Sequence, residues 1–154
     1  YSRDWQSLQL SVLWPATQLP DAEENHQSCV LKISDGTHSV LLSGDIGKAE
    51  EQWLVKNSAQ DLASTVLVAP HHGSNTSSSA NFIRAVAPSW VIFSNGFKNR
   101  WGFPSQMVVN RYYQHNIKQL ATGESGQIRF RFSKLTGKPV MVATYTEQPQ
   151  AWYF

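Results

Sequence analysis

Cysteine, charge and long apolar runs are all scarce in this sequence of 154 residues. The single cysteine, Cys29, excludes an internal disulfide framework and a zinc knuckle built from cysteines. Only 16% of the residues are charged while 41% are hydrophobic, which argues against a disordered chain and against a highly charged coiled coil. The longest apolar runs, such as residues 66–69 and 90–93, are far shorter than the roughly 20 residues of a membrane-spanning helix. The composition therefore predicts one folded domain with a buried core.

The charges are divided unevenly along the chain. Residues 1–61 carry 4 basic and 9 acidic side chains, a net charge of −5, whereas residues 62–154 carry 9 basic and 2 acidic ones, a net charge of +7. A cationic half of this kind can attract a polyanion such as nucleic acid, but globular proteins also divide their charges in this way without any such partner. Both interpretations stay open from charge alone.

Apolar periodicity predicts an α/β chain. Alternation predicts strands at residues 8–14, 29–34 and 39–42, with Asp35-Gly36 as a two-residue hairpin turn between the last two and a loop at residues 15–27. Residues 48–56, 80–86 and 105–115 have helical spacing, and short apolar runs at 65–69 and 90–94 lie between them. This alternation of strands and helices indicates an α/β layer, and residues 127–132 and 140–145 predict a closing hairpin.

Chemically active side chains follow two of the predicted strands, which is where open α/β sheets bind their ligands. Asp45 follows the string Leu-Leu-Ser-Gly and is a candidate metal ligand or base, the alternative being that it caps the helix that starts near Gly47. His71 and His72 end the next strand. Histidine is the commonest metal ligand, so one imidazole of the pair could bind a metal while the other contacts substrate or supports the site.

A third polar loop, residues 94–104, follows the next strand. We expect Asn99 and Arg100 to contact phosphate, and Trp101 and Phe103 to offer ring faces for stacking. The alternative is a turn with a surface arginine and two core aromatic side chains. Three such loops after three successive strands favour a functional site over three unrelated turns.

The remaining candidate residues are expected to have structural roles. Cys29 is expected to pack as a small hydrophobic side chain within its strand. His38 flanks a turn and His115 ends a helix, where an imidazolium favours the helix dipole. The sequence contains no nucleophile elbow, Walker loop or dinucleotide fingerprint.

Taken in order, these strings resemble the C-terminal part of the metallo-β-lactamase-like domain of ComEC-family DNA-internalisation (competence) proteins. The likeness is carried by Leu-Leu-Ser-Gly-Asp at 41–45, Val-Leu-Val-Ala-Pro-His-His-Gly-Ser at 66–74, Ala-Pro at 87–88, Asn-Arg at 99–100 and Thr-Gly-Glu-Ser-Gly at 122–126. It implies an α/β fold, namely the second half of an αββα sandwich, with a mixed sheet, flanking helices and a C-terminal β-hairpin.

The resemblance also implies a centre of two divalent ions, zinc or manganese, that cleaves phosphodiesters. Asp45 would bridge the two ions, and either His71 or His72 would be the last histidine ligand, with His72 favoured and His71 contacting substrate. The residues implied to contact DNA are Ser74, Asn99 and Arg100.

One departure from the family limits this expectation, because its main ligand string, H-x-H-x-D-H, is absent from the sequence. We therefore expect residues 1–154 to be one truncated domain of a longer protein of the bacterial cytoplasmic membrane, facing the periplasm or exterior. Its partners would be single-stranded DNA, the remainder of the same protein, and a second copy bound through the uncovered sheet face. The parent domain would be a nuclease that degrades one DNA strand, whereas the 154 residues alone would bind metal weakly or not at all and be inactive.

Two other functions stay open. One is a non-catalytic DNA-binding or scaffolding domain whose metal centre has decayed. The other is a related metallohydrolase that acts on a small phosphodiester or on choline phosphate.

Overall fold

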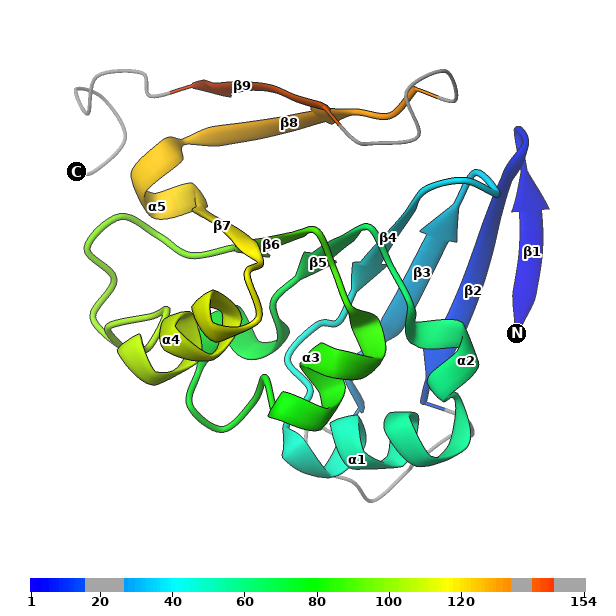
Figure 1. Cartoon of the computed structure of the whole chain (residues 1–154), viewed down its shortest axis with the longest axis horizontal. Helices are drawn as coiled ribbons and strands as arrows, with labels where there is room; N and C mark the ends of the chain where they lie inside the picture. Colours follow the sequence, from blue (N-terminus) through cyan, green and yellow to red (C-terminus); the bar gives the residue numbers. More distant parts are fainter. Residues whose placement is uncertain (16–26, 134–139, 146–154) are drawn as a thin grey trace.

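The computed structural model describes residues 1–15 and 27–133, together with the backbone of residues 140–145. A mixed seven-stranded sheet runs through the molecule with its strands in sequence order (Figure 1). The first four strands form an antiparallel meander, and the last three each run parallel to the strand before them. The strands are β1 (Ser2–Trp5), β2 (Leu8–Trp14), β3 (Val30–Ser34), β4 (Ser39–Leu42), β5 (Val66–Val68), β6 (Trp90–Phe93) and β7 (Lys118–Ala121).

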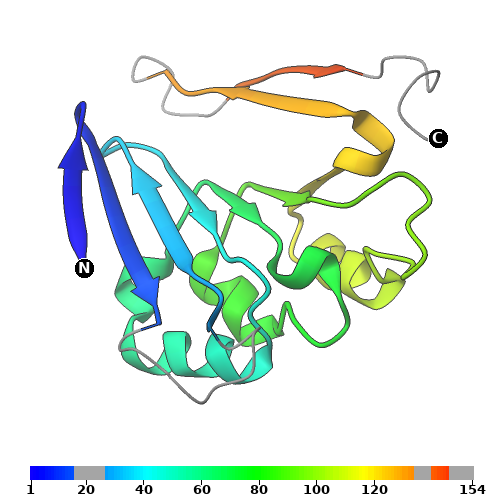
Figure 2. The same ribbon diagram turned by 180° about the vertical axis from the view of Figure 1, so that it is seen from behind.

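Helices cover one face of this sheet (Figures 1 and 2). Leu41, Leu67 and Val91 pair in register across three neighbouring strands, so their side chains share a face, and all three are fully buried. They pack in one hydrophobic cluster with apolar side chains of the helices. These helices are α1 (Lys48–Asn57), α2 (Ala59–Leu62), α3 (Ala80–Val86) and α4 (Gln106–Gln114), whereas the single turn α5 (Thr122–Ser125) connects β7 to the strand after it and has no buried residue.

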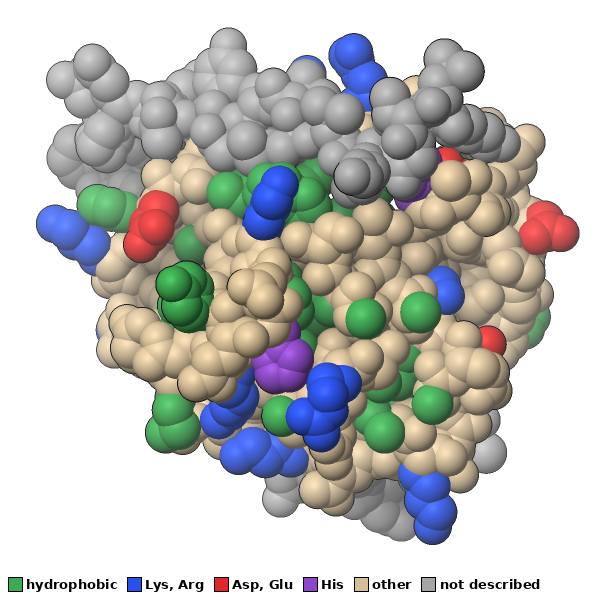
Figure 3. Space-filling model, viewed as in Figure 1, with side chains coloured by type: hydrophobic (Ala, Val, Ile, Leu, Met, Phe, Trp, Pro, Cys, Tyr) green, Lys and Arg blue, Asp and Glu red, His purple; other side chains and the backbone are tan. Residues whose placement is uncertain are grey.

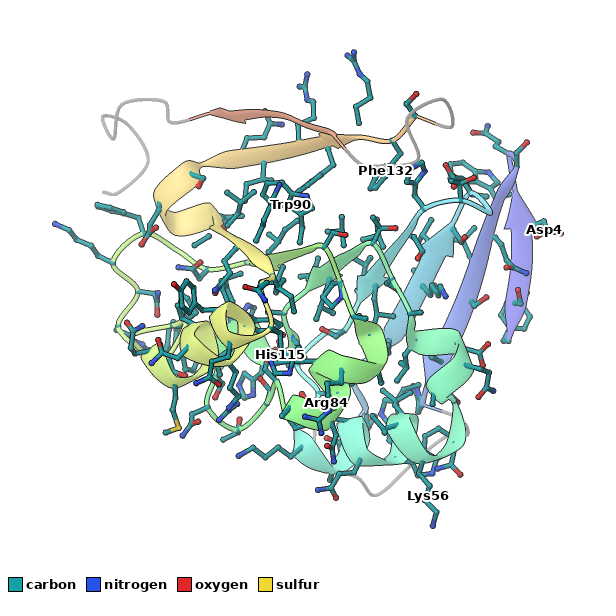
Figure 4. All side chains as sticks on the ribbon, viewed as in Figure 1. Asp4, Lys56, Arg84, Trp90, His115 and Phe132 are labelled. Carbon is teal, nitrogen blue, oxygen red and sulfur yellow. The ribbon has the colours of Figure 1, made fainter. Side chains whose placement is uncertain are left out.

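The opposite face of the sheet is partly covered by a second, two-stranded sheet, formed by β8 (Gln127–Arg131) and β9 (Val140–Tyr145). The rings of Trp90 on β6 and Phe130 on β8 are 5.5 Å apart, and those of His38 and Phe132 are 5.4 Å apart. Figure 4 shows Trp90 and Phe132 between the two sheets. Helices on one face and a second sheet on the other agree with part of an αββα sandwich.

Most of the predicted elements are confirmed, including the closing hairpin. The predicted hairpin turn at Asp35-Gly36 is instead a four-residue loop, closed by a hydrogen bond of 3.1 Å from the Asp35 N–H to the carbonyl oxygen of His38. The prediction for Cys29 was wrong, because this residue precedes β3 and its side chain is exposed. Strands β1 and β7 were not predicted, and most of the predicted loop 15–27 and the turn at 136–139 lie outside the described residues.

Parallel pairing places the carboxyl ends of β4, β5, β6 and β7 along one edge of the sheet. The loops that leave these ends are residues 43–47, 69–79 and 94–105, and α5 follows the last strand. All of the predicted functional residues are on these three loops. In the part of the chain that is described, none of the helices has the length and apolar character needed to span a membrane.

Candidate metal centre

Asp45 lies three residues beyond the end of β4, where the chain passes close to Ser28. The preceding Gly44 has φ +55°, and a Cβ atom there would lie 3.1 Å from the Cβ atom of Ser28. The Ser28 hydroxyl accepts a hydrogen bond of 3.2 Å from the Asp45 N–H. Asp45 does not cap helix α1, because the N-cap is Gly47, whose N–H donates to the carboxylate of Glu50 over 2.8 Å. The Asp45 side chain is 40% exposed and so remains accessible at the sheet edge.

His72 is the histidine that contacts Asp45. Its Nε2 atom lies 3.4 Å from Oδ1 of Asp45, and its Nδ1 atom lies 2.6 Å from the carbonyl oxygen of Ser94. A carbonyl oxygen only accepts, so Nδ1 carries a proton and donates it. This hydrogen bond fixes the orientation of the ring and aims Nε2 at the carboxylate, which is how proteins orient a metal-binding imidazole.

The facing atoms both offer lone pairs. When Nδ1 holds the only ring proton, Nε2 and the Asp45 carboxylate are both acceptors, and a divalent metal ion between them would bind to both. Two ligands each about 2.0–2.1 Å from a tetrahedral zinc ion are about 3.4 Å apart. The observed separation of 3.4 Å and the carboxylate and imidazole donors therefore fit a shared divalent metal.

The His71 side chain contacts other residues than the His72 side chain does. Its Nδ1 atom lies 3.4 Å from the hydroxyl of Thr76, and its ring centre is 6.0 Å from that of Phe103 and 6.4 Å from that of His72. Its main-chain N–H donates to the carbonyl oxygen of Gly44 over 3.0 Å, which ties the histidine loop to the Asp45 loop. His71 therefore borders the pair formed by Asp45 and His72 without a direct contact to the carboxylate.

The two histidines have a costly backbone conformation. His71 has φ +49° and His72 has φ +54°, and each residue with a side chain in this left-handed region costs about 1–2 kcal/mol. Such a conformation persists only where the surrounding structure enforces it. Backbone strain of this kind is characteristic of functional sites.

The loop that follows the histidines is held by helices α1 and α4. Glu51 on α1 is fully buried, and its carboxylate accepts hydrogen bonds from the N–H groups of Ser78 and Ser79. Arg111 on α4 donates to the carbonyl oxygen of Ser78 over 3.0 Å, and the buried Tyr112 donates to the Ser78 hydroxyl over 3.1 Å. Burial raises the pKa of the Glu51 carboxyl, and the hydrogen bonds from Ser79 and Ser78 oppose this shift. These contacts fix the loop in which the strained histidines lie.

Of the residues implied to contact DNA, two are engaged inside their own loops. Ser74 is buried, and its hydroxyl lies 3.0 Å from that of Thr76. The Asn99 side chain donates to the carbonyl oxygen of Phe103 over 2.6 Å and accepts from the Phe103 N–H over 2.9 Å. Arg100 is exposed, with its guanidinium carbon 4.4 Å from the centre of the Trp101 ring. A role in DNA contact stays a prediction for all three, and Arg100 is the most accessible of them.

The donors present make only part of a metal site. Among the described residues there is no group of three or more His, Cys, Asp or Glu side chains that could hold a metal ion. A complete zinc site has about four ligands, and manganese takes more. Asp45 and His72 fit the chemistry of a divalent metal but do not complete its coordination.

Three supporting groups were missed by sequence reasoning. Ser28 and the carbonyl oxygen of Ser94 act on Asp45 and His72 through hydrogen bonds that no spacing pattern reveals. Glu51 belongs to an acidic first helical turn, which is an ordinary feature of helices. Its hydrogen bonds from the N–H groups of Ser78 and Ser79, visible only in the fold, distinguish it from Glu50, which is also buried.

No family model matches this sequence. The chain is 40% identical to the uncharacterised protein YcaI of Escherichia coli over 129 residues, which cover 84% of this chain and 17% of that protein. It is 38% identical to competence protein ComA of Neisseria gonorrhoeae over 126 residues, which cover 82% of this chain and 18% of that protein. With recombination protein 2 of Haemophilus influenzae it shares 36% identity over 128 residues, 83% of this chain and 16% of that protein.

The matched region is a small part of each relative, because this chain spans about one sixth of their length. The identity is 36–40% over more than four fifths of this chain. The resemblance deduced from the motifs is thus confirmed, and the chain is homologous to a segment of the ComEC-family competence proteins.

Proposed function

We propose that this chain is part of the metallo-β-lactamase-like domain of a bacterial DNA-uptake protein, and that the domain hydrolyses DNA phosphodiesters with bound divalent metal. The observation that carries the proposal is the contact between Asp45 and His72, whose facing acceptor atoms, 3.4 Å apart, lie at the edge where parallel strands end. The similarity to competence proteins supports the link to DNA uptake.

Each site residue has a distinct task in this proposal. Asp45 and His72 hold the metal, and the carbonyl oxygen of Ser94 keeps the His72 ring in the tautomer that leaves Nε2 free to bind it. Bound divalent metal lowers the pKa of water and stabilises the charge that develops on a phosphodiester. His71 lies at the border of the site to contact substrate, and Arg100 attracts the phosphate backbone.

The missing metal ligands would come from residues outside these 154. The two donors found among the described residues cannot supply two sites of about four to six ligands each, so we expect the chain by itself to bind metal weakly and to be inactive. The parent protein would be in the cytoplasmic membrane with this domain on its outer side, where the two divalent ions would be zinc or manganese. The remainder of that protein would then be the first partner of this chain.

A non-catalytic DNA-binding or scaffolding domain is the second candidate function. It is favoured by the absence of a three-donor group among the described residues and by the net charge of +7 on residues 62–154. Basic side chains gather over the lower part of the face seen in Figure 3, around helices α3 and α4. Such a charge distribution binds DNA without any need for metal.

The test is nuclease activity of the parent protein with added Mn²⁺ or Zn²⁺, measured on single-stranded DNA and on a small chromogenic diester. Asp45→Asn should lower the rate on DNA more than about 100-fold, since a ligand substitution exceeds the 10–100-fold effect of altering a supporting residue. The control is Asp61→Asn, an exposed residue at the far end of the helix pair. Nuclease activity that survives Asp45→Asn would remove Asp45 from the mechanism. If neither the wild-type parent protein nor the variant is active, the non-catalytic scaffold is favoured. Activity on the small diester alone favours a substrate other than DNA.

A further inference from the structure

The loop between β6 and α4, residues 94–104, exposes two aromatic rings, each paired with a cation. The Trp101 side chain is 64% exposed and that of Phe97 is 45% exposed. The guanidinium carbon of Arg100 lies 4.4 Å from the centre of the Trp101 ring, and the Lys98 ammonium lies 5.2 Å from the centre of the Phe97 ring. Aromatic surface and positive charge therefore alternate along one short stretch of chain.

This loop is fixed rather than loosely attached. The Asn99 side chain donates to the carbonyl oxygen and accepts from the N–H of Phe103, which closes the loop around residues 99–103. At its ends, the Asn95 N–H donates to the hydroxyl of Thr122 over 2.9 Å, and the Ser105 N–H donates to the carbonyl oxygen of Gly73 over 2.9 Å. A preorganised loop loses little conformational entropy when a ligand binds to its exposed rings.

The loop also borders the proposed metal centre. Its first residue, Ser94, accepts the hydrogen bond from His72, and the ring of Phe103 is 6.0 Å from that of His71. Phe103 is half-buried in this position, so it is less available for stacking than Trp101. A cavity of about 750 Å³ lies beside the loop, lined by Phe97 and Lys98 among others, and Glu124 is the one acidic side chain among its described lining residues.

We infer that Trp101 and Phe97 form a base-stacking platform for single-stranded DNA, with Arg100 and Lys98 contacting its phosphates. Unpaired bases offer ring faces for stacking, whereas the bases of a duplex are stacked on one another and offer only their edges. The cation that lies over each ring suits a ligand in which bases and phosphates alternate. The inference rests on the proposed function for the choice of DNA, but the platform contains no metal ligand, so it should bind without metal.

The test is fluorescence anisotropy of the 154-residue chain in EDTA, with labelled oligo-dT, an abasic strand of equal length, and a duplex. We expect oligo-dT to bind at least about 10-fold more tightly than the abasic strand or the duplex. Trp101→Ala should weaken oligo-dT binding about 5- to 100-fold and leave abasic binding unchanged, while Trp101→Phe should retain most of the affinity. Phe97→Ala should act in the same direction as Trp101→Ala.

Two further variants separate charge from stacking. Arg100→Gln should weaken binding of both strands and reduce the salt slope by about 0.7. Tyr113→Ala is the control, because Tyr113 is a 77% exposed aromatic side chain on α4, outside the loop. Equal binding of oligo-dT and the abasic strand, or an unchanged affinity in Trp101→Ala, would overturn the platform. Because this binding is measured in EDTA, the platform stands or fails independently of the nuclease.

Discussion

Substituting Gly73 by alanine should destabilise the protein through two separable effects. Gly73 has φ +83°, and a Cβ atom there would lie 2.7 Å from the Cβ atom of Pro104 and 2.8 Å from a ring carbon of Phe93. The left-handed backbone costs a residue with a side chain about 1–2 kcal/mol. Forcing a methyl group into occupied space costs about 1–3 kcal/mol more. We therefore expect Gly73→Ala to lower the free energy of unfolding by about 3 kcal/mol.

Gly36→Ala is the control that isolates the steric part. Gly36 has φ +86°, almost the same as Gly73, but a Cβ atom there would meet nothing within 4 Å. It should therefore cost only the backbone term of about 1–2 kcal/mol. Urea denaturation of both variants measures the two free energies. If Gly73→Ala costs no more than Gly36→Ala, the described packing of the histidine loop against β6 and the loop 94–104 is wrong.

Three further predictions concern pH and association. Because burial raises the pKa of Glu51 above its ordinary 4.5, the free energy of unfolding should fall as pH rises from 4.5 through that raised pKa. Glu51→Gln should remove this decline, and a parallel pH profile in the variant would refute it. Hydrogen bonds from the N–H groups of His38 and Thr37 hold the pKa of Asp35 at about 2. The ionised Asp35 side chain therefore adds to the free energy of unfolding above pH 3.8, and this stabilisation is lost as pH falls through 2. Asp35→Asn should cost about 1 kcal/mol at pH 7 and flatten this acid loss in urea titrations, given partial solvent screening. Sedimentation at roughly tens of micromolar should show self-association through the part of the sheet face around β1 and β2 that the second sheet leaves open, reduced by Trp5→Asp. A clean monomer would contradict this.

Strong periodicity made most of the fold predictable. The strand at Trp90–Phe93 and the helix at Ala80–Val86 have apolar residues at the spacing their burial requires. The edge strand Ser2–Trp5 has four exposed residues, and Lys118–Ala121 mixes polar and apolar side chains, so neither shows the alternation of a half-buried strand. Their pairing depends on neighbours that are distant in the sequence.

The position of the candidate site was predictable, but its details were not. Asp45 and the histidine pair follow strands, and parallel strands bring their carboxyl ends together. Strand parity could not choose between His71 and His72, because both have left-handed backbone after Pro70. Their side chains are directed by a loop that is held from helices α1 and α4, and those long-range hydrogen bonds leave no local pattern in the sequence.

The most direct test of the metal centre is paramagnetic broadening of the five histidine ring signals by Mn²⁺ in the 154-residue chain. This measurement detects weak binding, which two protein donors can provide. The account predicts that the His72 ring broadens at the lowest Mn²⁺ concentration, and that Asp45→Asn removes this selectivity. Equal broadening of all the histidines, or selective broadening of His72 that is unchanged by Asp45→Asn, would contradict a shared metal between Asp45 and His72.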